Sequence, residues 1–118
     1  MAKKIVEDTQ QVPMNPFLKA ADISAKGRTM LLLTGWSRRA APRVTQGIAF
    51  GEQIILEVQD EHETLYDFSV SVGSPNHKTL HKAFGPDEKF WRGSIAVERQ
   101  QGSKAPFVAI VEAAKPQR

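Results

Sequence analysis

Apolar and polar residues alternate most regularly over residues 64–72, and this period of two predicts a β-strand with one buried face. Residues 52–59 alternate in the same way, and the charged segment 60–63 predicts a tight hairpin between the two strands. Residues 47–50 are expected to begin the earlier of these strands, with Gly51 as a bend. The residues predicted to face the core are Ile54, Leu56, Val58, Tyr66, Phe68, Val70 and Val72.

A further strand is predicted before this hairpin, over residues 28–36, and a polar loop over residues 37–46 follows it. Strict alternation would place Met30, Leu32, Thr34 and Trp36 on one face, and Leu31 and Leu33 on the other. A fourth strand is predicted after the lead-in 90–93, with Ile95 and Val97 facing inward. A polar turn over residues 99–105 separates it from a fifth strand over residues 107–111.

Two helical segments are predicted from capping signals. Ser74 followed by Pro75 is typical of a helix N-terminus, and Gly85-Pro86 is typical of its end. Asn15 followed by Pro16 predicts a second, short N-terminal helical segment that ends before Gly27.

The predicted order is three strands, a helix and two strands, which indicates a mainly β fold. We expect a five-stranded OB-like barrel with one helix between strands three and four. A β-sandwich fragment and an SH3-like barrel are the alternatives. A length of 118 residues suits one domain, with a flexible arm over residues 1–14, the barrel over residues 15–113 and a polar tail over residues 114–118.

Composition narrows the chemistry. The chain has no cysteine, which excludes disulfides, thiolate metal ligands and cysteine nucleophiles. Apolar runs such as residues 30–33 are far too short to cross a bilayer, so we expect no membrane association and a cytoplasmic protein. A formal net charge of +3 permits nucleic-acid binding without requiring it.

Three short blocks resemble small phage and prophage proteins related to single-stranded DNA-binding proteins. They are residues 17–23 (FLKAADI), residues 84–87 (FGPD) and residues 90–95 (FWRGSI). The resemblance implies an OB fold and a role in viral or mobile-element DNA replication, in which case the host cytoplasm is the expected location.

The basic residues of two predicted loops are the strongest functional signal. In OB folds, the loops after strands one and four flank the ligand groove. Neither residues 37–51 nor residues 99–105 contain an acidic residue, so both loops would attract phosphates. The cations concerned are Arg38, Arg39, Arg43, Arg99 and Lys104. A solvated surface loop is the alternative interpretation.

Exposed aromatic rings would supply base stacking, for which Trp36 is the first candidate and Phe50 the second. Tyr66 and Phe68 are expected to pack in the core, and Trp91 to close one end of the barrel. That arrangement leaves Glu57 and Asp67 on the outer face of the hairpin, where they would repel a polyanion.

No residue pattern supports catalysis. His77 and His81 share a helix face but lack a third metal ligand, so we expect structural or solvent-facing histidines and no metal site. Neighbouring carboxylates lie in predicted turns, and no phosphate-binding loop or nucleophile elbow occurs. We therefore expect no enzymatic activity and no cofactor.

Two functions fit these observations. The first is sequence-tolerant binding of single-stranded nucleic acid, with DNA favoured over RNA and homo-oligomers compatible with the open strand edges. With about four phosphates neutralised, log affinity would fall with log salt at a slope of roughly −3. The second is a protein–protein interaction or virion-assembly module that binds no nucleic acid.

Overall fold

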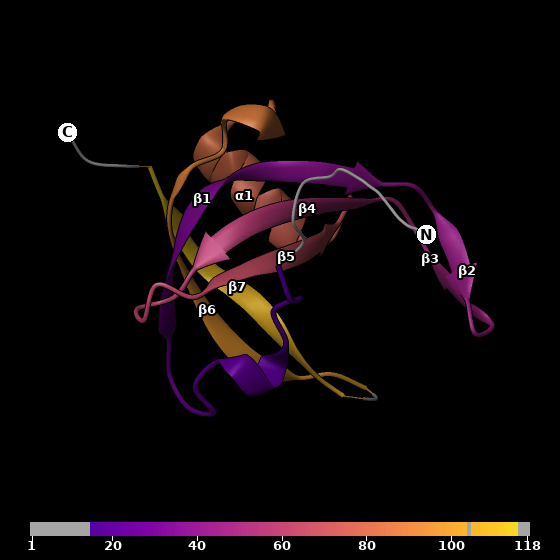
Figure 1. The fold of residues 1–118 in the computed structure, drawn as a ribbon, viewed down its shortest axis with the longest axis horizontal. Helices are drawn as coiled ribbons and strands as arrows, with labels where there is room; N and C mark the ends of the chain where they lie inside the picture. The colour runs from indigo at the N-terminus through magenta and orange to yellow at the C-terminus, as the bar shows by residue number, and fades with distance from the viewer. Residues whose placement is uncertain (1–14, 104, 116–118) are drawn as a thin grey trace, which may run out of the picture.

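Five antiparallel strands form the main sheet of the protein, which a computed structural model describes over residues 15–103 and 105–115. Their order in the sheet is β5-β4-β1-β6-β7, as Figure 1 shows. The strands are β1 (Thr29–Ala40), β4 (Gln53–Gln59), β5 (Leu65–Ser71), β6 (Gly93–Gln101) and β7 (Pro106–Ala114). The mainly β fold is confirmed, but the sheet is not closed into a barrel: β5 and β7 are its two outer strands.

The predicted domain limits differ slightly from the structure. β7 runs to Ala114, so the predicted tail begins one residue too early. The predicted arm over residues 1–14 and the end of the tail, residues 116–118, lie outside the described residues.

The predicted loop over residues 37–46 is wrong. β1 continues to Ala40, and a two-stranded hairpin of β2 (Arg43–Thr45) and β3 (Ile48–Phe50) follows it. Gln46 and Gly47 join the two strands with φ values of 53° and 78°, and two positive values in succession suit the right-handed twist of a tight hairpin. The hairpin projects from one side of the main sheet (Figure 1).

The helix α1 (Pro75–Phe84) confirms the capping prediction. The Ser74 hydroxyl accepts a hydrogen bond from the His77 amide, and Gly85 ends the helix at a φ of 100°. Leu80 is fully buried. The other helical pieces of the described residues are the 3₁₀ turns η2 (Ala20–Asp22) and η3 (Glu88–Phe90).

The N-terminal segment does not begin as a helix at Asn15. Phe17 instead lies parallel to β5, beside Asp67. The Leu18 amide donates to the Asp67 carbonyl at 2.8 Å, and the Asp67 amide donates to the Pro16 carbonyl at 2.9 Å. The outer edge of β5 offers backbone groups that need partners, whereas an isolated helical turn is costly to nucleate. Extended pairing therefore replaces most of the predicted helix and leaves only η2.

The core lies on the concave side of the sheet, against α1. Ile54, Leu56 and Val58 are fully buried, and Phe68 stands opposite Leu56 with 4% of its surface exposed. Tyr66 packs against the same cluster, so both aromatic residues of β5 face the core, as predicted. Trp91 is also fully buried, and its indole Nε1 donates to the Gly85 carbonyl at 2.8 Å. The contacts of Trp91 therefore hold the segment 85–92, which connects α1 to β6, against the core.

Strict alternation fails in β1. Leu31 and Leu33 face the core, in agreement with their alternation. Between Leu33 and Gly35, however, β1 contains one residue more than the paired part of β4. One extra residue turns every following side chain to the other face. Trp36 consequently lies opposite Leu56 and packs on the core, not beside exposed Met30 and Leu32. A second extra residue, between Trp36 and Arg38, turns Arg38 outward again.

Gly93 provides a test of how closely β6 packs. Its φ is 153°, and a Cβ added there would lie 2.2 Å from the Ala114 carbonyl oxygen. We expect Gly93→Ala to lower the unfolding free energy by about 2 kcal/mol or more, because strain and a backbone clash add together. Thermal unfolding followed by circular dichroism measures this. Gly51→Ala is the control, since an added Cβ there meets nothing within 4 Å. Equal melting temperatures for the two variants would contradict the close contact.

Candidate nucleic-acid interface

A groove of about 480 Å³ lies on the outer face of the sheet, between the β2–β3 hairpin and the N-terminal segment. We call it the hairpin groove. Ile55 and Ser69 belong to its lining, and none of the described residues that line it is acidic. Three predicted site residues meet here: Arg38, Arg43 and Phe50. The remaining lining residues are Phe17, Ala40 and Gln53.

Arg43 and Phe50 face each other across the hairpin. They are paired in the β2–β3 register, and the Arg43 guanidinium carbon lies 4.9 Å from the centroid of the Phe50 ring. This cation–π contact holds the guanidinium at the groove while Arg43 remains exposed. The pair therefore presents a positive charge and a planar group together.

Arg38 enters the groove but also has a structural partner. Its Nη1 lies 3.1 Å from Asp67 Oδ2, and only 3% of the Asp67 side chain is exposed. A buried carboxylate needs a counter-charge or hydrogen-bond donors. Arg38 supplies the charge, so this arginine is less free to bind a ligand than its exposure alone suggests.

The carboxylates of Glu57 and Asp67, which were expected to repel a polyanion, accept hydrogen bonds from neighbouring side chains. Asn15 Nδ2 donates to Glu57 Oε2 at 3.2 Å and to Asp67 Oδ1 at 3.3 Å. The Thr34 hydroxyl donates to Glu57 Oε1 at 2.7 Å. Both residues were predicted on the outer face of the hairpin; they stand opposite each other on β4 and β5, and Asp67 is almost entirely covered. Arg38 compensates the charge of Asp67, whereas Asn15 and Thr34 are neutral donors that orient the Glu57 carboxylate without removing its charge.

Arg39 lies away from the hairpin groove, opposite Ile54 in the β1–β4 register. Its guanidinium forms ion pairs with Glu52 and with Glu88, the latter at 2.7 Å. The hydrogen bond from Arg39 holds the pKa of Glu88 below its ordinary value of 4.5, against the opposing effect of desolvation. Arg39 thus fastens η3 to β1.

Arg99 is placed on β6, not in the predicted turn. Its guanidinium donates to the carbonyl oxygens of Ala20 and Ile23 at 2.9 and 2.8 Å. This side chain fixes η2 against the sheet. Lys104, the last predicted cation, lies outside the described residues.

Trp36, the first candidate for stacking, is packed against the core and also lies away from the hairpin groove. The Lys89 ammonium lies 5.6 Å from its ring centroid. Sequence reasoning missed Phe17 instead, which borders the groove with 43% of its surface exposed. Its position directly after Pro16 suggested a helix. Residues 16–18 form an extended segment that pairs with the edge of β5. An apolar residue in a segment that can pair in this way is the sequence signal that would have identified Phe17.

The two histidines of α1 have local partners. His77 Nδ1 accepts a hydrogen bond from the Gly73 amide at 3.0 Å, and the rings of His77 and His81 lie 6.0 Å apart. Over residues 15–103 and 105–115, no three metal-ligating side chains come together. Within the same ranges, no helix has the length and apolar character needed to cross a membrane.

Known proteins add nothing to this picture: no protein-family model, curated protein or solved structure matches the chain. The resemblance to phage single-stranded DNA-binding relatives stays a prediction that depends on its three residue blocks.

The Arg38–Asp67 pair predicts a stability effect. Arg38→Ala leaves the buried Asp67 carboxylate without its counter-charge, so we expect a loss of about 1–3 kcal/mol in unfolding free energy. The double variant Arg38→Ala/Asp67→Asn should recover part of that loss, because the charge is removed. Urea denaturation of the three proteins measures both effects. If the single variant is as stable as the original protein, the pair does not stabilise the fold.

The Arg39–Glu88 pair predicts a pH effect. A carboxyl whose folded-state pKa is lowered contributes stability that is present above its unfolded pKa and is lost as pH falls through the folded value. We therefore expect the stability advantage over Glu88→Gln to shrink as pH falls below 4.5. Melting temperatures from neutral pH down to about pH 3 test this. A difference that stays constant with pH would show that the ionised carboxylate contributes nothing.

Proposed function

We propose that the protein binds single-stranded nucleic acid in the hairpin groove. The observation that carries the proposal is the lining of this groove, in which the described residues include two arginines and two phenylalanines and none that is acidic. Cations attract the phosphates of a single strand, and aromatic faces stack its bases without selecting among them. The binding would therefore tolerate sequence and depend strongly on salt.

The topology supports the same proposal. Three strands, β1, β4 and β5, form a meander, α1 follows, and β6 then pairs with the far side of β1. We interpret this order as that of an OB-like barrel left open between its third and fifth strands, which supports the proposal. In that comparison, the β2–β3 hairpin stands in the loop between strands one and two, which borders the ligand groove of OB folds.

Each groove residue has a distinct role in the proposal. The exposed guanidinium of Arg43 would pair with a phosphate, or extend a base stack from the Phe50 ring over which it lies. Phe17 would stack a second base on the other side of the groove. Arg38 would contribute charge while it stays paired with Asp67. None of these roles breaks a covalent bond, so the proposal is a binding protein, with the phage replication context implied by the resemblance.

Salt dependence tests the proposal first. Among the described residues the groove holds two arginines, and one of them, Arg38, is already paired with Asp67, so between about one and two phosphates are neutralised. Log affinity for a single-stranded thirty-mer should then fall with log salt at a slope of roughly −1. Fluorescence anisotropy at several salt concentrations measures this slope. Absence of binding at low salt, or a slope near zero, would overturn the proposal.

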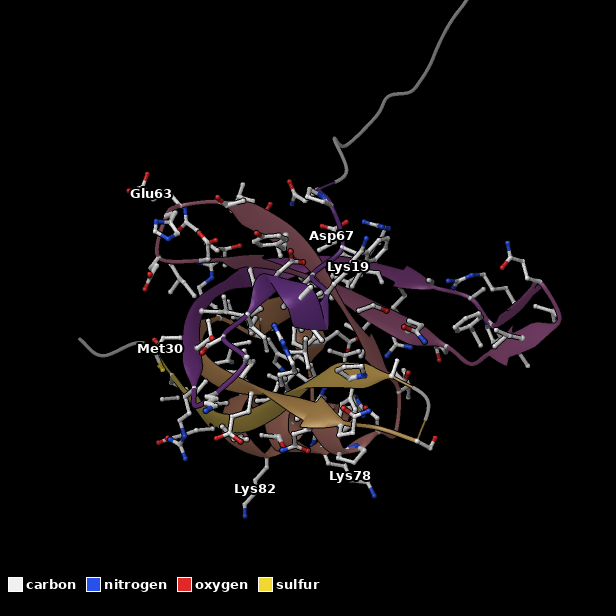
Figure 2. The ribbon with its side chains drawn as sticks, turned by 90° about the horizontal axis from the view of Figure 1, so that it is seen from below. Lys19, Met30, Glu63, Asp67, Lys78 and Lys82 are labelled. Carbon is white, nitrogen blue, oxygen red and sulfur yellow. The ribbon has the colours of Figure 1, made fainter. Side chains whose placement is uncertain are left out.

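Two substitutions locate the binding site. Arg43→Ala and Phe50→Ala should each weaken binding about 5- to 150-fold, the range expected for losing a stacked base. Lys82→Ala is the charge-matched control, because Lys82 projects from α1 on the side opposite Asp67 (Figure 2). Arg38→Ala is a poor probe here, since it also unpairs a buried carboxylate. Equal losses in Arg43→Ala and Lys82→Ala would indicate attraction by net charge alone.

A protein-interaction function remains the second candidate, for one reason. The projecting hairpin exposes 72% of Val44 and 57% of Ile48, and exposed apolar side chains are typical of contact surfaces. Sizing chromatography separates the two candidates. A shift with oligonucleotide supports the first, and concentration-dependent assembly without oligonucleotide that Val44→Ser abolishes supports the second.

A further inference from the structure

A second, larger groove of about 750 Å³ separates the outer strands β5 and β7. We call it the edge groove. Phe68 and Ser71 line it from the β5 side, and Phe107 and Ile110 line it from the β7 side. The N-terminus of α1 and residues 17–20 complete its border. Its volume lies within the range that small organic groups occupy in proteins.

The open sheet creates this groove. Asn76 of α1 satisfies the edge of β7, because its side-chain amide donates to the Val108 carbonyl at 3.0 Å and accepts from the Ile110 amide at 2.9 Å. Residues 16–18 satisfy the edge of β5 at Asp67. With both edges held apart by side chains and a short segment, β5 and β7 do not pair and the space between them stays open.

Two residues border both grooves. Phe17 and Ser69 line the edge groove and also the hairpin groove. The two grooves are therefore neighbours on the surface, with Phe17 and Ser69 on their common border. Phe107 lies in the edge groove with 46% of its surface exposed.

The lining of the edge groove favours bases over phosphates. Lys19 is the one charged residue among the described residues that line it, and none of them is acidic. Apolar surface predominates, and the uncharged polar residues of the lining are Ser69, Ser71, Ser74, Asn76 and Gln100. A polyanion would tolerate this lining, and its planar bases have both an apolar face and a hydrogen-bonding edge.

From these contacts we infer that the edge groove is a second base-binding subsite, in which Phe107 stacks a base of the same strand that occupies the hairpin groove. The inference rests on the proposed function. The strand crosses Phe17, so Phe50, Phe17 and Phe107 form one series of stacking positions, and Lys19 neutralises one further phosphate. The number of nucleotides bound is therefore larger than the hairpin groove alone can hold.

Oligonucleotide length separates the two subsites. Homothymidine oligonucleotides of about 4 to 16 nucleotides, the span of reported sites on single OB folds, are titrated by fluorescence anisotropy. Phe107→Ala should bind the shortest ones as tightly as the original protein does. It should bind the longer ones about 5- to 150-fold more weakly. Phe107→Leu, which keeps apolar packing, should show the same loss at long lengths.

The controls make the outcomes distinct. Phe90→Ala removes an aromatic ring that is 80% exposed and borders neither groove, so its affinity should not change at any length. A uniform effect of Phe107→Ala at all lengths, or no effect at any length, overturns the second subsite while the proposed function stands. If the original protein binds no oligonucleotide, both are overturned.

Discussion

The central strand β1 changes face twice, and both the core and the outer groove depend on where it does so. An extra residue after Leu33 turns Trp36 into the core, and an extra residue after Trp36 returns Arg38 to the outer face. Two insertions together amount to one full period of a strand, so the second restores the original alternation. Between them β1 bends, which is how bulges curve a sheet. A large ring is thereby added to the core without displacing the arginine beneath the groove.

Arg38 on the outer face meets a carboxylate that is nearly inaccessible to solvent. Asp67 lies under residues 15–18, whose backbone pairs with β5, and Arg38 and Asn15 provide the polar contacts that its burial requires. Arg39 and Arg99 also have partners within the fold: Arg39 binds two glutamates, and Arg99 binds two carbonyl groups. Three of the five predicted site cations, Arg38, Arg39 and Arg99, therefore hold parts of the fold together. A candidate ligand meets the cations that remain exposed, of which Arg43 is the clearest.

The candidate site combines the exposed cations with three phenylalanines. Phe17, Phe50 and Phe107 lie along grooves that exist because the sheet stays open between β5 and β7 and because the β2–β3 hairpin projects beside it (Figure 1). In a closed barrel, pairing between β5 and β7 would fill the edge groove with backbone. The openness of the sheet is thus the feature that would give a single strand a continuous path.

Local patterns determined a good part of this protein. The alternation in β4 and β5 identified their buried faces, and Ser74-Pro75 and Gly85-Pro86 identified the ends of α1, because these signals act within a few residues. Tertiary structure decided what Trp36, Arg39, Arg99 and the segment 15–18 do. The bulges in β1 depend on its pairing with β4, and the extended segment 16–18 depends on the free edge of β5. Arg38 and Asp67 lie on strands distant in sequence, so their ion pair forms only in the tertiary structure.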